Sequence, residues 1–241
     1  MEKKEVYSRF GFDVEGKEFD EIIKRIRKYG NIKICGFQMH RSGNSRSVEI
    51  YKSMIYAAED IAQKKKIDLE FIDLGGGMKL GVSEELTAIS YMQGIKEALD
   101  KTKMNGVYII LEPGNSLVYR SIDYIAKVID VKYVGESCYA TLDGSRIHTD
   151  PLFRKKKYLE IEIQSKSKVE HKKLYLCGFT CKETDRFMIL NNQQIDVGDY
   201  VVFKQIGSYT MSLVPSFIQG FPRVYIVQEG KISIQKDKEM L

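Results

Sequence analysis

Leu69-Glu-Phe-Ile-Asp-Leu-Gly-Gly-Gly77 joins a short apolar strand pattern directly to three glycines. Two similar strand patterns flank it, over residues 32–39 and 107–111, and they lead into His40 and Glu112. Helical periodicity is found around them, over residues 18–29, 48–65, 84–103 and 116–129. Strands that alternate with helices and end in polar or glycine residues predict a parallel βα sheet or barrel, with its site at the carboxyl ends of the strands.

The periodicity changes near Lys132. Short alternating strand patterns follow over residues 158–164, 173–178, 200–204 and 223–228, with turn residues such as Gly198-Asp199 between them. We therefore predict two domains in a chain that is α/β plus all-β. Residues 1–131 are expected to form a partial (β/α) TIM-like barrel of about three to four βα units. Residues 132–241 are expected to form an antiparallel β-sandwich or barrel.

The composition indicates a globular protein. Hydrophobic residues make up 43% and charged residues 29% of the 241 residues, enough to build a sizeable core. No apolar run approaches the roughly 20 residues of a membrane helix, and the first residues do not form a signal peptide, so the cytosol is the expected location. The formal net charge of +5 is dispersed, and we expect neither a nucleic-acid nor a membrane partner.

The cysteines and histidines argue against a metal or disulfide scaffold. Only three histidines are present, and the four cysteines contain no C-x-x-C pair. We therefore expect free thiols and no metal site. The four cysteines are Cys35, Cys138, Cys177 and Cys181.

Each strand end has a chemical and a plain structural interpretation. Three glycines let main-chain N–H groups approach an anion closely, because no Cβ is in the way, yet a glycine triplet is more often a simple turn. His40 fits a cofactor contact or an ordinary loop histidine. Glu112 fits a functional carboxylate or a helix N-terminal one. The residues alone leave these alternatives open.

The order of the motifs adds information. Phe37-Gln-Met-His-Arg-Ser-Gly43, Asp73-Leu-Gly-Gly-Gly77 and Leu111-Glu-Pro-Gly114 together resemble the pyridoxal-phosphate amino-acid decarboxylases of the alanine-racemase-like fold. That family includes diaminopimelate, ornithine, lysine and arginine decarboxylases. Ser8-Arg-Phe-Gly11 is similar to its SKFG-type segment.

The second half of the chain continues the resemblance in collinear order. Cys181-Lys-Glu-Thr-Asp185 resembles the family's C-x-x-x-D signature. Gly198-Asp199 followed by Gly207-Ser-Tyr209 resembles its GD…GAY signature. The resemblance therefore covers essentially the whole chain.

The resemblance implies pyridoxal 5'-phosphate as the cofactor. His40 would stack on the pyridine ring, Glu112 would pair with the ring nitrogen, and the glycines would hold the phosphate through their N–H groups. Ser42 and Tyr209 would add hydrogen bonds to the phosphate. The residues implied to bind the cofactor are His40, Ser42, Gly75, Gly76, Gly77, Glu112, Gly114 and Tyr209.

The implied reaction is α-decarboxylation of an amino acid through an external aldimine and a quinonoid. Cys181 would return a proton to the α-carbon, acting across a homodimer interface, and Asp185 would lie near the substrate. The implied catalytic residues are thus Cys181, Glu112 and His40. For Cys181, the alternative is an inert small residue at a strand end.

One family element has no counterpart here. The Schiff-base lysine of these enzymes lies in a YAxKAN-like segment far upstream of the SKFG-type segment, and no lysine in this chain has comparable neighbours. We therefore expect a subunit or fragment that is inactive alone and needs a separate N-terminal half chain carrying the lysine. The alternative is a non-catalytic, decarboxylase-like binding or regulatory protein. A racemase is less favoured, because the Cys181 pattern is typical of decarboxylases.

Smaller departures concern the ligands. Serine and glycine are exchanged at Ser42-Gly43, and Asn115 replaces the arginine of EPGR-type members. Lys182 replaces the usual acidic residue after the cysteine, which favours an anionic or carboxylated substrate over lysine or ornithine. A solvent-facing Lys182 is the alternative.

Overall fold

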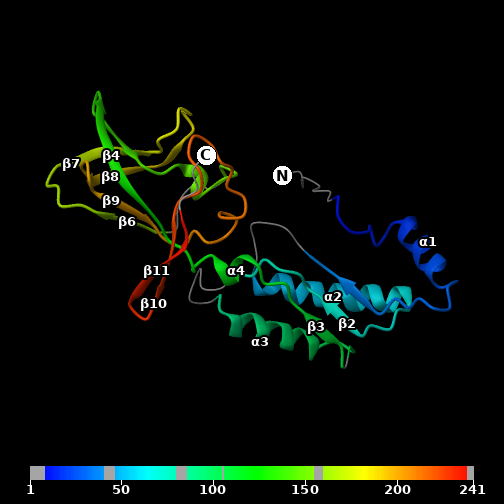
Figure 1. Cartoon of the computed structure of the whole chain (residues 1–241). Helices are drawn as coiled ribbons and strands as arrows, with labels where there is room; N and C mark the ends of the chain where they lie inside the picture. Colours follow the sequence, from blue (N-terminus) through cyan, green and yellow to red (C-terminus); the bar gives the residue numbers. More distant parts are fainter. Residues whose placement is uncertain (1–8, 41–46, 80–85, 105, 155–159, 238–241) are drawn as a thin grey trace. The chain divides into compact units, whose positions relative to one another are not determined.

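The computed structural model describes residues 9–40, 47–79, 86–104, 106–154 and 160–237 (Figure 1). Its internal contacts divide the chain into two compact units, residues 1–116 and 117–241. Each unit has its own hydrophobic core. Within the described ranges, no helix has both the length and the apolar character needed to cross a bilayer.

The first unit contains a three-stranded parallel sheet. Its order is β1-β2-β3, with β1 at Gly36–Gln38, β2 at Phe71–Asp73 and β3 at Tyr108–Ile110. The helices are α1 (Lys17–Ile26), α2 (Val48–Lys65) and α3 (Ala88–Leu99), and the short α4 (Asn115–Val118) spans the boundary between the two units. The parallel strands predicted from the sequence are thus present.

Helices α2 and α3 cover one face of this sheet (Figure 1). Ile72 of β2 is fully buried beneath them, and Phe37 and Ile109 of the neighbouring strands pack into the same cluster. The helices contribute Tyr51 and Tyr91, which are also buried. Because side chains alternate along a strand, the residues between these point to the other face. Tyr108, on that open face, is 77% exposed.

The second unit is built on a six-stranded sheet of order β6-β9-β4-β5-β7-β8. Strands β5 and β7 are parallel, and the other neighbouring pairs are antiparallel, so the sheet is mixed rather than purely antiparallel as predicted. A short 3-10 helix, η1, spans Arg146–His148. The strands are β4 (Tyr124–Val134), β5 (Ser137–Leu142), β6 (Ile161–Gln164), β7 (Glu170–Cys177), β8 (Arg186–Gln194) and β9 (Tyr200–Phe203).

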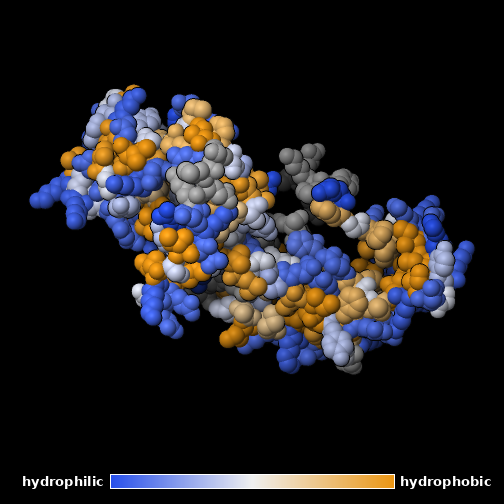
Figure 2. Space-filling model, viewed as in Figure 1, coloured by the Kyte–Doolittle hydropathy of each residue, from blue (hydrophilic) through white to orange (hydrophobic). Residues whose placement is uncertain are grey.

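A separate two-stranded hairpin follows the sheet. It consists of β10 (Val224–Gln228) and β11 (Lys231–Lys236), paired antiparallel. Val227 faces Ile232 across it, and both are 70% exposed. Hydrophobic residues of the hairpin are visible at the surface in Figure 2.

The prediction of a helix over residues 116–129 is wrong for the residues that follow α4. Strand β4 begins at Tyr124, and Ala126 and Val128 point into the core while Ile125 is 62% exposed. This alternation has a period of two, and the same apolar residues also fit a helical period. Because β4 pairs with β5 and β9, the units divide between Ser116 and Leu117, earlier than the predicted boundary after residue 131.

Candidate functional site

The three parallel strands end at the same level. Gln38, Asp73 and Ile110 are in register across the sheet. Two residues further on in each chain segment come His40, Gly75 and Glu112. Main-chain hydrogen bonding between neighbouring segments continues past the ends of β2 and β3, since Glu112 N donates to Gly75 O at 3.0 Å. Three of the sequence-predicted residues are therefore brought to one edge of the sheet.

The glycine loop after β2 fits closely between its neighbours. Gly75 and Gly77 have φ values of +64° and +93°, which other residues adopt at a cost. A Cβ on Gly75 would lie 2.5 Å from His40 Nδ1. A Cβ on Gly76 would overlap the carbonyl oxygen of Glu112. Glycine is therefore required both for the turn and for the approach of the two neighbouring strand ends.

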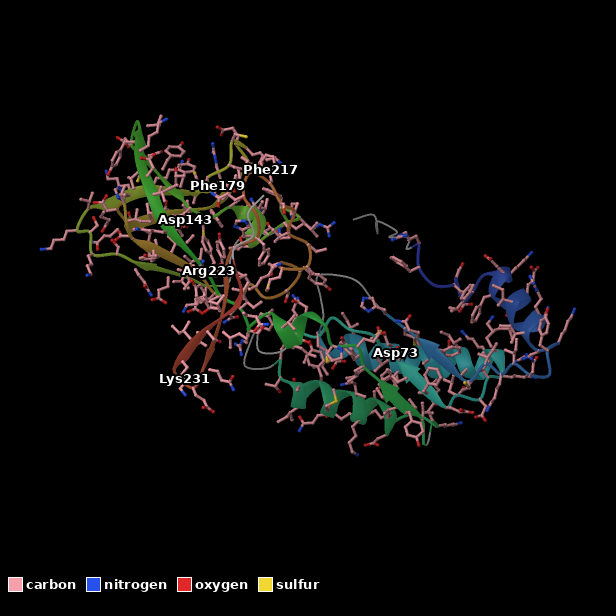
Figure 3. The ribbon with its side chains drawn as sticks, in the orientation of Figure 1. Asp73, Asp143, Phe179, Phe217, Arg223 and Lys231 are labelled. Carbon is pink, nitrogen blue, oxygen red and sulfur yellow. The ribbon has the colours of Figure 1, made fainter. Side chains whose placement is uncertain are left out.

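Residues that sequence reasoning missed hold this loop in place. Asp73 Oδ1 accepts a hydrogen bond from Gly75 N at 2.8 Å, and Figure 3 shows Asp73 in the β-sheet of this unit. Tyr51 of α2 donates its hydroxyl to Gly76 O at 2.8 Å. Tyr91 of α3 packs edge-on against Tyr51, with ring centroids 5.2 Å apart. Tyrosines on otherwise apolar helix faces were the available signal, because a buried hydroxyl needs a partner.

The loop has N–H groups that can bind an anion. The N–H of Gly75 is taken by Asp73. Within the described part of the chain, neither the N–H of Gly76 nor that of Gly77 donates a hydrogen bond. Two adjacent main-chain donors in a glycine turn form a suitable concavity for a phosphate group. His40 and Glu112 are both exposed beside it, so a ligand can reach the edge from solvent.

The remaining predicted residues are placed as follows. Ser42 lies outside the described residues. Gly114 is exposed, and a Cβ on it would meet nothing within 4 Å. Tyr209 belongs to the second unit and is 67% exposed. Cys181 and Asp185 also belong to the second unit.

Cys181 differs from the other thiols of its unit. It is exposed, in the connection between β7 and β8. Burial raises the pKa of the Cys138 thiol and of the Cys177 thiol, so both hold their protons strongly. All four cysteines of the chain are free. Cys181 is therefore the most exposed thiol of the second unit.

Comparison with known proteins matches the first unit to a family. Residues 2–119 match the family described as pyridoxal-dependent decarboxylase, pyridoxal binding domain. The first half of this chain is therefore similar to that family. The matched region contains His40, the glycine loop and Glu112, which the sheet brings together.

Curated decarboxylases resemble the chain beyond this region. The chain is 25% identical over 243 residues to diaminopimelate decarboxylase of Helicobacter pylori, covering 95% of this chain and 58% of the relative. It is 25% identical over 222 residues to 2-[(L-alanin-3-ylcarbamoyl)methyl]-2-hydroxybutanedioate decarboxylase of Staphylococcus aureus, covering 84% of this chain and 55% of the relative. The chain thus spans a little over half the length of these relatives.

Solved decarboxylase structures share the fold. Diaminopimelate decarboxylase from Helicobacter pylori, complexed with L-lysine, matches with a TM-score of 0.75 at 22% identity, covering 92% of this chain and 56% of that chain. Lysine/ornithine decarboxylase from Vibrio vulnificus, complexed with cadaverine, matches with a TM-score of 0.73 at 20% identity, covering 87% and 58%. These matches extend across both units.

Proposed function

We propose that this chain forms part of a pyridoxal-phosphate-dependent amino-acid decarboxylase. The observation that carries the proposal is the common edge at which His40, the glycine loop and Glu112 meet, within the region that matches the pyridoxal binding domain. The reaction proposed is loss of the α-carboxylate of an amino acid as carbon dioxide. When bound, the cofactor supplies an electron sink for the electrons that the departing carboxylate leaves behind.

The residues at this edge fit the cofactor. The N–H groups of Gly76 and Gly77 would bind its phosphate. The His40 ring, which lies against Gly75, would contact the pyridine ring. The Glu112 carboxylate would hold a proton on the pyridine nitrogen. Ser42, Gly114 and Tyr209 are proposed as further cofactor contacts.

Cys181 is proposed as the proton donor. Its thiol is exposed, as a group that must reach a substrate has to be. The thiol proton on Sγ would pass to the α-carbon after carbon dioxide leaves. A second copy of the chain is proposed to bring Cys181 to the cofactor edge of its partner.

The Schiff-base lysine is proposed to come from outside residues 1–241. Lys33, the lysine nearest to β1, lies before that strand, at the end of the sheet opposite His40. Its ammonium pairs with Glu70 at 2.5 Å. A lysine held there faces away from the carboxyl ends of the strands. We propose that another segment presents the lysine to the cofactor.

Borohydride trapping tests this proposal. The purified chain is mixed with pyridoxal phosphate, reduced with borohydride, digested and mapped by mass spectrometry, first alone and then with its co-purifying proteins. We expect cofactor binding without a pyridoxyl-lysine in residues 1–241, and a pyridoxyl-lysine on the segment that completes the site. Decarboxylation of an amino acid should appear only in the completed assembly.

Two results would contradict the proposal. A specific pyridoxyl-lysine within residues 1–241 would place the Schiff base in this chain. A chain that binds no pyridoxal phosphate, alone or in its native assembly, would instead favour the decarboxylase-like binding protein. A competition with inorganic phosphate serves as control, because it tests whether the glycine loop holds the phosphate group.

The proposed substrate is an amino acid with a distal carboxylate. Lys182 follows Cys181 directly, is exposed, and lies 4.9 Å from the ring centroid of Phe217. A cation beside the proton donor attracts a carboxylate and repels an ammonium group. Lys182→Glu should therefore raise the KM for such a substrate in the assembled enzyme and leave kcat within about twofold. An unchanged KM would remove Lys182 from substrate recognition.

A further inference from the structure

The turn that carries Cys181 joins β7 to β8 and comprises residues 178–185. Residues 181–184 are exposed. Exposed connections are usually the most mobile part of a domain. A proton donor must nevertheless be held close to its acceptor, because small displacements cost large factors in rate. The arrangement of this turn therefore decides whether Cys181 can act.

Asp185 closes the turn through its main chain. Gly178 N donates to Asp185 O at 2.7 Å, and Asp185 N donates to Lys182 O at 2.9 Å. These bonds shape the loop around Cys181. They leave the Asp185 carboxylate directed into the protein, where the residue is only 2% exposed.

The carboxylate ties the turn to a second segment. Oδ2 accepts hydrogen bonds from Thr180 Oγ1 at 2.6 Å and Thr180 N at 3.1 Å. Oδ1 accepts from Arg146 N at 2.8 Å and from Ser145 Oγ at 3.0 Å. Ser145 caps η1 and Arg146 is its first residue, at the corner where the chain passes from β5 into η1. Thr180 directly precedes Cys181, so the bond at Oδ2 fixes the main chain next to the thiol.

Gly178 is part of the same arrangement. A Cβ on Gly178 would overlap the carboxylate of Asp185, which lies directly against its Cα. Phe179, labelled in Figure 3, follows Gly178, and its N–H donates to Gly144 O at 3.2 Å. The turn is thus docked on the β5–η1 corner at two neighbouring points, one through the main chain and one through the carboxylate.

The donors around this carboxylate leave it little capacity for a ligand. An ionised carboxylate has about four lone-pair sites. Four hydrogen bonds from this chain already occupy them. A substrate ammonium group would have to displace one of these buried donors, which then loses its partner at a cost.

We infer that Asp185 is a positioning residue whose carboxylate fixes the turn presenting Cys181, rather than a ligand of the substrate. The inference rests on the proposed role of Cys181, and it replaces the substrate contact expected for Asp185 from the family resemblance. Thr180 and Ser145 act with Asp185 as the side chains that anchor the turn to the β5–η1 corner.

Hydrogen exchange on the whole chain provides the first test. Asp185→Asn and Thr180→Val should each speed exchange of the amides in residues 179–184 by about tenfold, because each loses a hydrogen bond to an ionised group. Thr180→Ser keeps the hydroxyl donor and should exchange like the parent. The amides of β7 and β8 should stay within twofold, which separates a local release of the turn from general destabilisation. If Asp185→Asn fails to fold, Thr180→Val alone still tests whether the Asp185 carboxylate holds the turn. Unchanged exchange at the turn in Thr180→Val would overturn the inference.

Kinetics of the assembled enzyme provide the second test. Thr180→Val and Asp185→Asn should lower kcat about tenfold with KM within twofold, and Thr180→Ser should restore kcat. A KM raised tenfold in Asp185→Asn with kcat unchanged would make Asp185 a substrate ligand and overturn the inference. If no assembly decarboxylates an amino acid, the proposed function fails, while the exchange data still decide whether Asp185 holds the turn.

Discussion

Replacement of Gly76 by alanine gives the sharpest test of the glycine loop. The added Cβ would lie within 3.0 Å of the Glu112 carbonyl oxygen, whereas ordinary contact begins at 3.4 Å. The ends of β2 and β3 must therefore separate by more than 0.4 Å, the difference between these two distances. Because the obstacle is main chain, no side-chain rotation relieves it.

The free-energy cost of this separation has two sources. Overpacking of a close contact costs about 1–3 kcal/mol. Weakening of the hydrogen bond from Glu112 N to Gly75 O adds about 1 kcal/mol. The expected loss is therefore ~2–4 kcal/mol, which corresponds to a fall in the Tm of the first unit of roughly 8–16 °C. Pyridoxal phosphate should also bind about tenfold more weakly, since an anion contact at Gly76 is disturbed.

Thermal unfolding followed by circular dichroism measures the first effect, and absorbance titration with pyridoxal phosphate measures the second. Gly30→Ala is the matched control, because Gly30 has nothing within 4 Å of an added Cβ and does not have a positive φ. Its stability should stay within about 0.5 kcal/mol of the parent. A Gly76→Ala variant that melts and binds cofactor like Gly30→Ala would refute the assignment of the glycine loop.

Three further changes have defined outcomes. Glu112→Gln should abolish most activity of the assembled enzyme yet change the urea unfolding free energy by less than about 0.5 kcal/mol, because Glu112 is exposed; full activity would remove its role at the ring nitrogen. Tyr51→Phe loses the hydrogen bond to Gly76 O and should cost about 1 kcal/mol in urea unfolding, and no change would mean that the bond does not support the loop. Burial raises the pKa of the Cys138 thiol, so the stability linked to its proton is present below the unfolded pKa of about 8.5 and is lost as pH rises through the folded value. Urea unfolding at about pH 8 and pH 10 should show this loss, and Cys138→Ala should show less of it; equal losses would contradict the assignment.

The longer helices and the parallel strands of the fold were predictable from the sequence. The helix predicted over residues 48–65 is α2, with the same bounds, because its apolar residues repeat over several turns. The three parallel strands were placed correctly but are shorter than predicted. Strand β4 was missed because its apolar residues satisfy a helical and a strand period at once, and only pairing with β5 and β9 decides between them.

The candidate site was predictable only in part. That His40, the glycines and Glu112 come together follows from parallel strands ending at one edge. The support from Tyr51 and Asp73 depends on how helices and loops pack, and no short pattern encodes it. The surroundings of Asp185 were equally hidden, because two of its donors lie about forty residues earlier in the chain.

The common register of the parallel strands limits how such a chain can change in length. One residue inserted between Asp73 and Gly75 would shift the glycine loop against His40 and Glu112. We expect insertions and deletions to be tolerated instead where α2 leads back into β2, at residues 66–70, far from the carboxyl ends. Alignments of related genes should therefore show gaps at that end of the sheet and constant spacing at the other.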